Sequence, residues 1–172
     1  EGAMYPWECA WIDDGETCPK YGEMDMGTGE IRENKMCRIE VHLNAAVAYG
    51  VYHYFLATGD IDFMKRCGYE IIILTGLFWT SRAKFVNGRY EILDVIGPDE
   101  YKDNIDNNAY TNYMAHKNLV LASEILESNP CELLKKLEKE YSISQIKAKI
   151  SEVADKLYLP IPENDGIISQ FD

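Results

Sequence analysis

The chain has 172 residues, 47% of them hydrophobic, and a formal net charge of −12. This length and composition suit one folded domain with a real core and argue against global disorder. The negative charge repels phosphate backbones, so we expect no nucleic acid partner. No apolar run approaches the roughly 20 residues of a membrane-spanning helix. The first residues lack the basic and apolar regions of a signal peptide, so we expect no membrane partner either.

Cysteine usage points to a reducing compartment. The five cysteines are odd in number, widely spaced and without a Cys-x-x-Cys pair: Cys9, Cys18, Cys37, Cys67 and Cys131. This pattern argues against a disulfide framework and against a zinc site. We therefore expect a cytoplasmic protein without a bound metal.

The first helical pattern follows a long irregular segment. Residues 1–38 combine Gly, Pro, Trp and acids without a helical period, which predicts a loop. Apolar residues then step by four and three along one face: Val41, Ala45, Ala48, Tyr52 and Phe55. The other faces of this segment are also apolar, so we expect the helix to be buried on most sides.

A second helix should follow at once. Thr58-Gly59-Asp60 supplies a helix stop and a new N-cap. The next apolar stripe is made of Met64, Cys67, Ile71, Leu74 and Phe78. Because the connector is short, the two helices should form an antiparallel hairpin.

The middle of the chain breaks the helical period. Asn87-Gly88 predicts a turn, and the "RYEILDVI" that follows reads as a short strand or an extended loop. A third helix should begin near Asn107, capped by Asp106 or Asn107, and run through Ile125.

Two further helices complete the pattern. One has Asn129 as its cap and Pro130 at its first position. The last should be capped by Ser142 or Ser144 and ended by Pro160 and Pro162. Its apolar stripe is Ile143, Ile146, Ile150, Val153 and Leu157. The predicted fold class is therefore all-α, with two long loops rich in acids and aromatic residues.

These two loops have the composition that carbohydrate binding requires. Carboxylates and amides bind sugar hydroxyls, while Trp and Tyr cover the faces of the ring. The first loop offers Tyr5, Trp7, Glu8, Trp11, Asp13 and Asp14. The second offers Asp94, Asp99, Glu100, Tyr101, Asn104 and Asn107.

Glu100 is the candidate proton donor of the second loop. Cleavage of a glycosidic bond needs an acid that protonates the departing oxygen, and neighbouring carboxylates raise the pKa of a Glu towards neutrality. Asp99, Asp103 and Asp106 are such neighbours in sequence. The alternative is structural, because acids before a helix favour its positive end and Gly-Pro is common in turns. On composition alone this alternative is the stronger one.

Several motifs in a fixed order resemble one family. They are "YPWE" (5–8), "WIDDGE" (11–16), "HLNAAVAYGVYHY" (42–54), "TGD" (58–60), "VIGPDEY" (95–101) and "DNNAYTN" (106–112). Together they resemble the central catalytic domain of glycoside hydrolase family 65, which includes phosphorylases of maltose, trehalose, kojibiose and nigerose. The resemblance covers nearly all of residues 1–127 and returns weakly at "GIISQFD".

The resemblance implies both a fold and a reaction. The fold is an (α/α)6 barrel, of which residues 1–172 would form a part. The reaction is inverting phosphorolysis of an α-glucoside to β-glucose 1-phosphate and a free sugar. It implies Glu100 as general acid and Trp7 and Glu8 as sugar contacts. Because inorganic phosphate is the co-substrate and nucleophile, no second carboxylate need activate water, and no cofactor is implied.

Three more residues are candidates through the resemblance. His42 is either a sugar contact or an ordinary residue at the start of its helix. Asp99 and Tyr101 either orient Glu100 or contact the substrate. Cys9 stands where the family has Ser and Lys102 where it often has His, which leaves recognition of the acceptor sugar open.

Parts of the family's site are not found in this chain. An aspartate-bearing loop, a Lys-Gln pair and the phosphate-binding region would come from elsewhere in a larger enzyme. We therefore expect the remainder of the enzyme as a partner, an inactive isolated chain and a homo-oligomer at full length. An α-glucoside hydrolase of the same family and a non-catalytic sugar-binding module are the rival functions.

Overall fold

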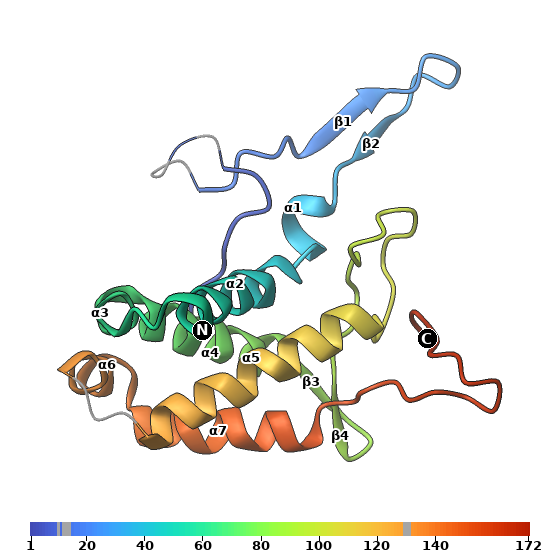
Figure 1. Ribbon diagram of the computed structural model, residues 1–172. Coiled ribbons are helices and arrows are strands. Elements are labelled where there is room, and N and C mark those ends of the chain that lie inside the picture. The colour runs from blue at the N-terminus through green and yellow to red at the C-terminus, as the bar shows by residue number, and fades with distance from the viewer. Residues whose placement is uncertain (10, 12–14, 129–131) are drawn as a thin grey trace.

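The computed structural model describes residues 1–9, 11, 15–128 and 132–172. Helices make up most of its regular structure, and two small hairpins accompany them (Figure 1). The helices are α1 (Met36–Ile39), α2 (Leu43–Thr58), α3 (Ile61–Phe63), α4 (Tyr69–Arg82), α5 (Ala109–Ser128), α6 (Glu132–Tyr141) and α7 (Ile143–Lys156), with a π-helical turn at Met64–Gly68. The strands are β1 (Tyr21–Met24), β2 (Ile31–Glu33), β3 (Lys84–Val86) and β4 (Arg89–Glu91).

The core forms where α4 packs against α2, α5 and α7. Trp79 of α4 is fully buried, and its indole Nε1 donates a hydrogen bond of 3.1 Å to Asn118 Oδ1 of α5. The same amide donates from Nδ2 to the Ile72 carbonyl at 3.0 Å, so both ends of this buried amide are paired. Gly76 lets α4 and α5 approach closely, because a Cβ there would lie 2.8 Å from that of Ala122.

The predicted boundary between the first two long helices is confirmed. Gly59 ends α2 in the left-handed conformation, with φ of 67°, and its N–H donates to the Phe55 carbonyl at 2.8 Å. Asp60 then caps the next helix, its carboxylate accepting from the Phe63 N–H at 2.9 Å. The two helices run in opposite directions, as expected (Figure 1). The π turn at Met64–Gly68 was not predicted.

The expectation that α2 is buried on most sides is wrong for this chain. Ala45 and Ala48 are buried, but Tyr54 is 44% and Leu56 59% exposed. Only one face of α2 packs on α4 and α5 here. An apolar helix with this many exposed side chains is unusual in a folded domain.

The all-α prediction needs a correction, because residues 1–38 contain the antiparallel hairpin β1–β2 and the short α1. This hairpin projects away from the helices (Figure 1). All three residues of β2 are exposed, so no buried alternation marked the strand in the sequence. The local feature that could have indicated the hairpin was its turn. There the Asp25 carboxylate accepts hydrogen bonds from the N–H groups of Gly27 and Thr28 at 2.8 and 3.0 Å.

The second hairpin follows the prediction closely. Asn87 and Gly88 form the turn, both with positive φ (48° and 89°), and connect β3 to β4. The strand covers only Arg89–Glu91 of the "RYEILDVI" segment, which then bends at Asp94 (φ 55°) before Val95 pairs with Ile105.

The cap of α5 is one residue later than predicted. Asn108, rather than Asp106 or Asn107, accepts from the Thr111 N–H and from its hydroxyl, both at 3.0 Å. Asn107 is left-handed (φ 51°), and its side-chain oxygen accepts from the Ile92 N–H at 3.3 Å. The Asp106 carboxylate accepts from the Asp94 N–H at 2.8 Å. Both predicted caps therefore hold the preceding loop instead.

The predicted caps of the last two helices have different outcomes. Asn129 and Pro130 lie outside the described residues. Ser142 stands before α7, but its hydroxyl makes no cap bond, and Ser144 lies inside the helix. The α7 stripe is confirmed at its described positions, since Ile146, Ile150, Val153 and Leu157 are buried. The helix ends at Lys156, before both prolines. Across the described ranges, every helix is too short or too polar to span a bilayer.

Candidate active site

The loop that carries Glu100 is fixed at its base. Val95 and Ile105 exchange backbone hydrogen bonds of 2.9 and 3.0 Å, which close the loop like a short antiparallel pair. The half-buried Arg82 guanidinium donates to the carbonyls of Leu93 and Asp94 at 2.6 and 2.8 Å. Glu100 therefore stands at the tip of a loop whose two ends cannot move independently.

Gly97 and Ile96 fix the direction of this loop. A Cβ at Gly97 would lie 2.6 Å from Nδ2 of the buried Asn108, so this contact accepts only glycine. The Ile96 N–H donates to the Ile39 carbonyl at 3.1 Å. This bond holds the loop against the end of α1, where Glu40 is the next residue.

The segment 167–172 lies beside the Glu100 loop and holds both neighbours of Glu100. Gln170 Nε2 donates to the Asp99 carboxylate at 2.6 Å, and Gln170 Oε1 accepts from the Tyr101 hydroxyl at 2.5 Å. The Gln170 carbonyl accepts from the Ala109 N–H at 2.8 Å, at the first turn of α5. Asp99 and Tyr101 are thus in contact with Gln170, an arrangement that suits positioning of Glu100. Sequence reasoning missed Gln170, because its partners lie some 70 positions away.

Replacing Gln170 tests this positioning. In the complete enzyme, Gln170→Ala is expected to lower kcat/KM about thirtyfold, since two hydrogen bonds of roughly 1 kcal/mol each are lost from the loop. The measurement is the initial rate of the reaction proposed below. Gln145→Ala, an exposed glutamine on α7, is the matched control and should leave the rate unchanged. Equal rates for wild type and Gln170→Ala would show that the loop is held without this side chain.

A buried carboxyl group that the sequence did not reveal lies next to Glu100. Glu40 is 3% exposed, and its Oε1 is 3.9 Å from His42 Nε2. Burial, and then the charge and hydrogen-bonding capacity of Glu100, raise the pKa of Glu40 to about 8. Near neutral pH this carboxyl group therefore holds its proton. Its only sequence signal was an acid three residues before the apolar helix α2.

His42 sits between aromatic rings. It is 8% exposed, and its ring lies 6.2 Å from that of Trp7 and 5.7 Å from that of Tyr110, in edge contact with the latter. Burial lowers the pKa of His42, although the Ile96 backbone and Glu100 act in the opposite direction. The imidazole is therefore neutral at pH 7, and its Nδ1 has no hydrogen-bond partner among the described residues.

The "YPWE" segment is attached to the same region. The Tyr5 N–H donates to the buried Asn44 Oδ1 of α2 at 2.6 Å. The Glu16 carboxylate accepts from the N–H groups of Trp7 and Glu8 at 2.5 and 3.0 Å, so it shapes the turn. Trp7 is half-buried beside His42, and Glu8 is exposed. The structure thus joins Trp7, His42, Glu40 and Glu100 in one region. Asp13 and Asp14 lie outside the described residues.

A hollow of about 360 Å³ borders Glu100. Tyr101 and Asp103 line it from the acid loop, and Arg32 and Lys35 line it from the hairpin side. The Lys35 ammonium is paired with Asp103 at 2.9 Å. Within the part of the chain that the structure describes, no three His, Cys, Asp or Glu side chains are grouped so that they could hold a metal ion.

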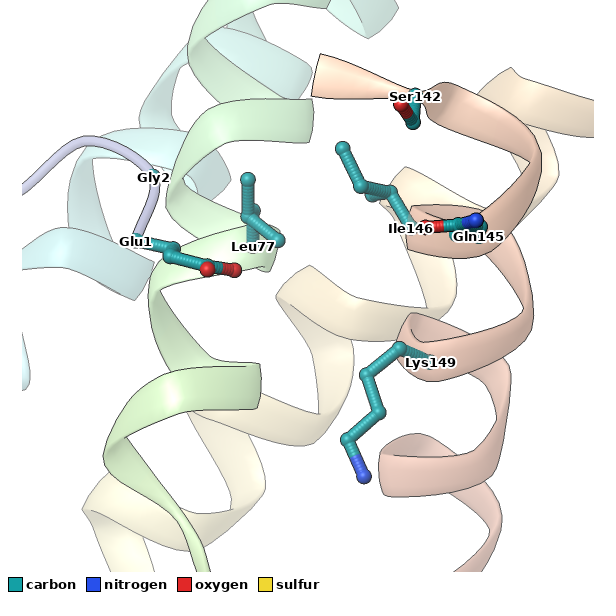
Figure 2. A pocket seen from close by; sticks show the side chains of 7 residues that line it. All are labelled: Glu1, Gly2, Leu77, Ser142, Gln145, Ile146 and Lys149. Atoms are coloured by element: carbon teal, nitrogen blue, oxygen red, sulfur yellow. The ribbon is translucent and has the colours of Figure 1, made fainter.

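A second hollow, of about 470 Å³, lies where the N-terminal residues, α4 and α7 meet (Figure 2). Its lining includes Leu77, Ile146 and Lys149 but none of the predicted site residues. Of the predicted site residues, Glu100 and Tyr101 line the hollow of about 360 Å³, whereas Trp7, Glu8, His42 and Asp99 are not part of its lining. Because it borders Glu100, this hollow is the candidate active site.

Comparison with known proteins assigns the chain to a family. The model of the glycosyl hydrolase family 65 central catalytic domain matches residues 1–172. The chain therefore belongs to glycosyl hydrolase family 65, as the sequence motifs indicated.

Individual proteins of known name are also similar to the chain. Kojibiose phosphorylase from Halothermothrix orenii is 44% identical over 183 residues, covering all of this chain and 23% of that protein. Nigerose phosphorylase from Lachnoclostridium phytofermentans is 36% identical, with 24% of its length covered. A solved structure of a putative kojibiose phosphorylase from the human microbiome matches with a TM-score of 0.69 and 27% identity, over 75% of this chain and 17% of that one. The chain thus spans about a quarter of the curated relatives.

Proposed function

We propose that this chain contributes to an enzyme that cleaves an α-glucosidic disaccharide by inverting phosphorolysis. The products are β-glucose 1-phosphate and a free sugar, and Glu100 is the general acid. The proposal rests mainly on the position of Glu100. Its loop is closed by backbone hydrogen bonds between Val95 and Ile105, and its side chain lines a hollow. Family membership and the phosphorylase names of the relatives support it.

The chemistry follows from one carboxylic acid. Glu100 protonates the glycosidic oxygen as the bond between this oxygen and the anomeric carbon breaks. At the same time, a phosphate oxygen attacks the anomeric carbon from the opposite face of the glucose ring. Trp7 and Glu8 would contact the glucose, with the Trp7 ring on an apolar face of the sugar. His42, neutral and with an Nδ1 that is unpaired among the described residues, offers one hydrogen bond to a hydroxyl group. Asp99 and Tyr101 keep Glu100 in place through Gln170.

We also propose that residues 1–172 form part of an (α/α)6 barrel completed by the remainder of the enzyme chain. The exposed apolar side chains of α2 support this, since Tyr49, Tyr54 and Leu56 are 40%, 44% and 59% exposed. Tyr113 of α5 is exposed as well. A cytoplasmic location and a homo-oligomeric full-length enzyme remain predictions from the sequence.

A product assay tests the proposed reaction. The complete enzyme is incubated with kojibiose, nigerose, maltose or trehalose, with and without inorganic phosphate, and the products are followed by proton NMR. We expect one disaccharide to give the β anomer of glucose 1-phosphate, and only when phosphate is present. Release of glucose without phosphate would identify an α-glucoside hydrolase instead. Binding without turnover of any disaccharide would identify a non-catalytic module.

A further inference from the structure

We propose that Tyr110 is a further substrate contact of this site, and that its ring packs on the departing sugar of the disaccharide while Trp7 packs on the glucose. This inference rests on the proposed function, because it assigns Tyr110 a task in the same reaction. Tyr110 lies in the motif at 106–112, but the resemblance of that motif to the family gives this side chain no role.

The start of α5 holds Tyr110 in place. Tyr110 is the second residue of this helix, and Asn108 caps the helix. Ala109, the first residue, donates from its N–H to the Gln170 carbonyl at 2.8 Å. Gln170 is also the residue whose side chain is hydrogen-bonded to both neighbours of Glu100. One residue therefore connects the backbone beside Tyr110 to the loop of the general acid.

Three aromatic side chains from three segments meet beside this loop. The His42 imidazole, directly before α2, lies 5.7 Å from the Tyr110 ring and 6.2 Å from the Trp7 ring, and the Tyr110 contact is edge-to-face. The group lies next to the acid loop, because the carbonyl of Ile39, three residues before His42, accepts from the Ile96 N–H at 3.1 Å. Both rings are thus in contact with one imidazole near Glu100.

The two rings keep accessible surface, whereas the imidazole that they contact is buried. Tyr110 is 43% exposed and Trp7 is half-buried. The Tyr110 hydroxyl makes no hydrogen bond to any described residue. The hydroxyl of Tyr113, one turn later on the same helix, instead donates to the Pro160 carbonyl at 2.8 Å. Tyr113 is therefore used within the fold, while Tyr110 offers a ring surface to a ligand.

Two accessible rings suit a disaccharide. The C–H groups on the face of a sugar pack on an aromatic ring. Glu100 protonates the oxygen that joins the two sugars, so one sugar lies on each side of that oxygen. Trp7 accounts for the glucose, and Tyr110 is then the ring available to the departing sugar. Neither ring lines the hollow that borders Glu100, so Tyr110 adds a contact that the hollow itself does not reveal.

The test compares two substrates in Tyr110→Ala of the complete enzyme. The first is the disaccharide that the wild type cleaves, and the second is α-glucosyl fluoride, which carries glucose but no second sugar. With phosphate present, kcat/KM for the disaccharide is expected to fall about tenfold, mainly through a higher KM, while kcat/KM for the fluoride stays within about twofold. A merely structural role would lower both values alike. Equal losses with both substrates, or no loss with the disaccharide, overturn the proposal.

Two further variants serve as controls. Tyr110→Phe keeps the ring and should stay within about twofold of the wild type for both substrates. A loss as large as that of Tyr110→Ala would overturn the ring contact. Tyr54→Ala removes a ring of similar exposure, 44%, near the other end of α2. It should leave the ratio of the two kcat/KM values unchanged, and a selective loss with the disaccharide there as well would also overturn the proposal.

Failure of this inference can be told apart from failure of the proposed function. If the wild type cleaves a disaccharide only with phosphate but Tyr110→Ala loses equally with both substrates, only the Tyr110 contact fails. If the wild type binds kojibiose, nigerose, maltose or trehalose without cleaving it, the proposed function fails. Calorimetry then tests the contact, because Tyr110→Ala should bind that disaccharide about tenfold more weakly. An unchanged Kd, or a wild type that binds none of the four, overturns it.

Discussion

Glu100→Gln in the complete enzyme is expected to lower kcat for phosphorolysis about 10²- to 10⁴-fold, the range that one general acid contributes. Gln has nearly the same shape but holds no transferable proton, so the loss falls on the chemical step. KM for phosphate should change little, because phosphate approaches the face of the sugar opposite the departing oxygen. The measurement is the initial rate of β-glucose 1-phosphate formation over a range of both substrates.

The matched control for this variant is Glu127→Gln. Glu127 is an exposed glutamate near the end of α5, with its carboxylate paired to Lys147 at 3.4 Å. Its replacement removes the same charge from a place away from the hollow, and the rate should stay at the wild-type value. Full activity of Glu100→Gln would remove the general acid from this site and favour a sugar-binding module.

The second prediction with a large effect is that the isolated chain lacks activity. Residues 1–172 in isolation are expected to show no detectable phosphorolysis, while the complete enzyme is active in the same assay. The chain spans only 23% of the Halothermothrix orenii relative. Of the two basic residues in the hollow, Lys35 is already paired with Asp103 and so is not free to bind phosphate.

Circular dichroism of the isolated chain provides the control. A helical spectrum would show that the missing activity does not result from unfolding alone. Phosphorolysis by the isolated chain would contradict the expectation, and it would show that these residues contain a complete phosphate site. Its exposed apolar side chains on α2 should also make the isolated chain self-associate, which sedimentation can measure.

The helices could be predicted because their signals are local. Apolar residues three and four positions apart marked α2, α4, α5 and α7, and the Gly59-Asp60 pair marked a boundary. The hairpin β1–β2 lacked such a signal, because all three residues of β2 are exposed and show no buried alternation. The cap of α5 was missed by one residue, since Asp106 and Asn107 hold the preceding loop. Competition between side chains for such roles is decided by tertiary contacts.

The residues of the candidate site also fall into those that local sequence indicated and those that it did not. Trp7, Glu8 and Glu100 could be named as candidates because they lie in motifs that resemble the family's. Glu40 and Gln170 were missed, because their importance depends on contacts across the chain. Glu40 gains its meaning from Glu100, 60 positions later, and Gln170 from Asp99, 71 positions earlier. Contacts between residues so far apart in the chain cannot be predicted from local sequence patterns.

The most direct measurement compares two substrates in Glu100→Gln. α-Glucosyl fluoride releases fluoride, which needs little help from an acid, whereas a disaccharide releases an alkoxide that must be protonated. If Glu100 is the proton donor, the variant should react with the fluoride and phosphate within roughly tenfold of the wild-type rate, while its disaccharide rate falls about 10²- to 10⁴-fold. Equal losses with both substrates would contradict the role of Glu100.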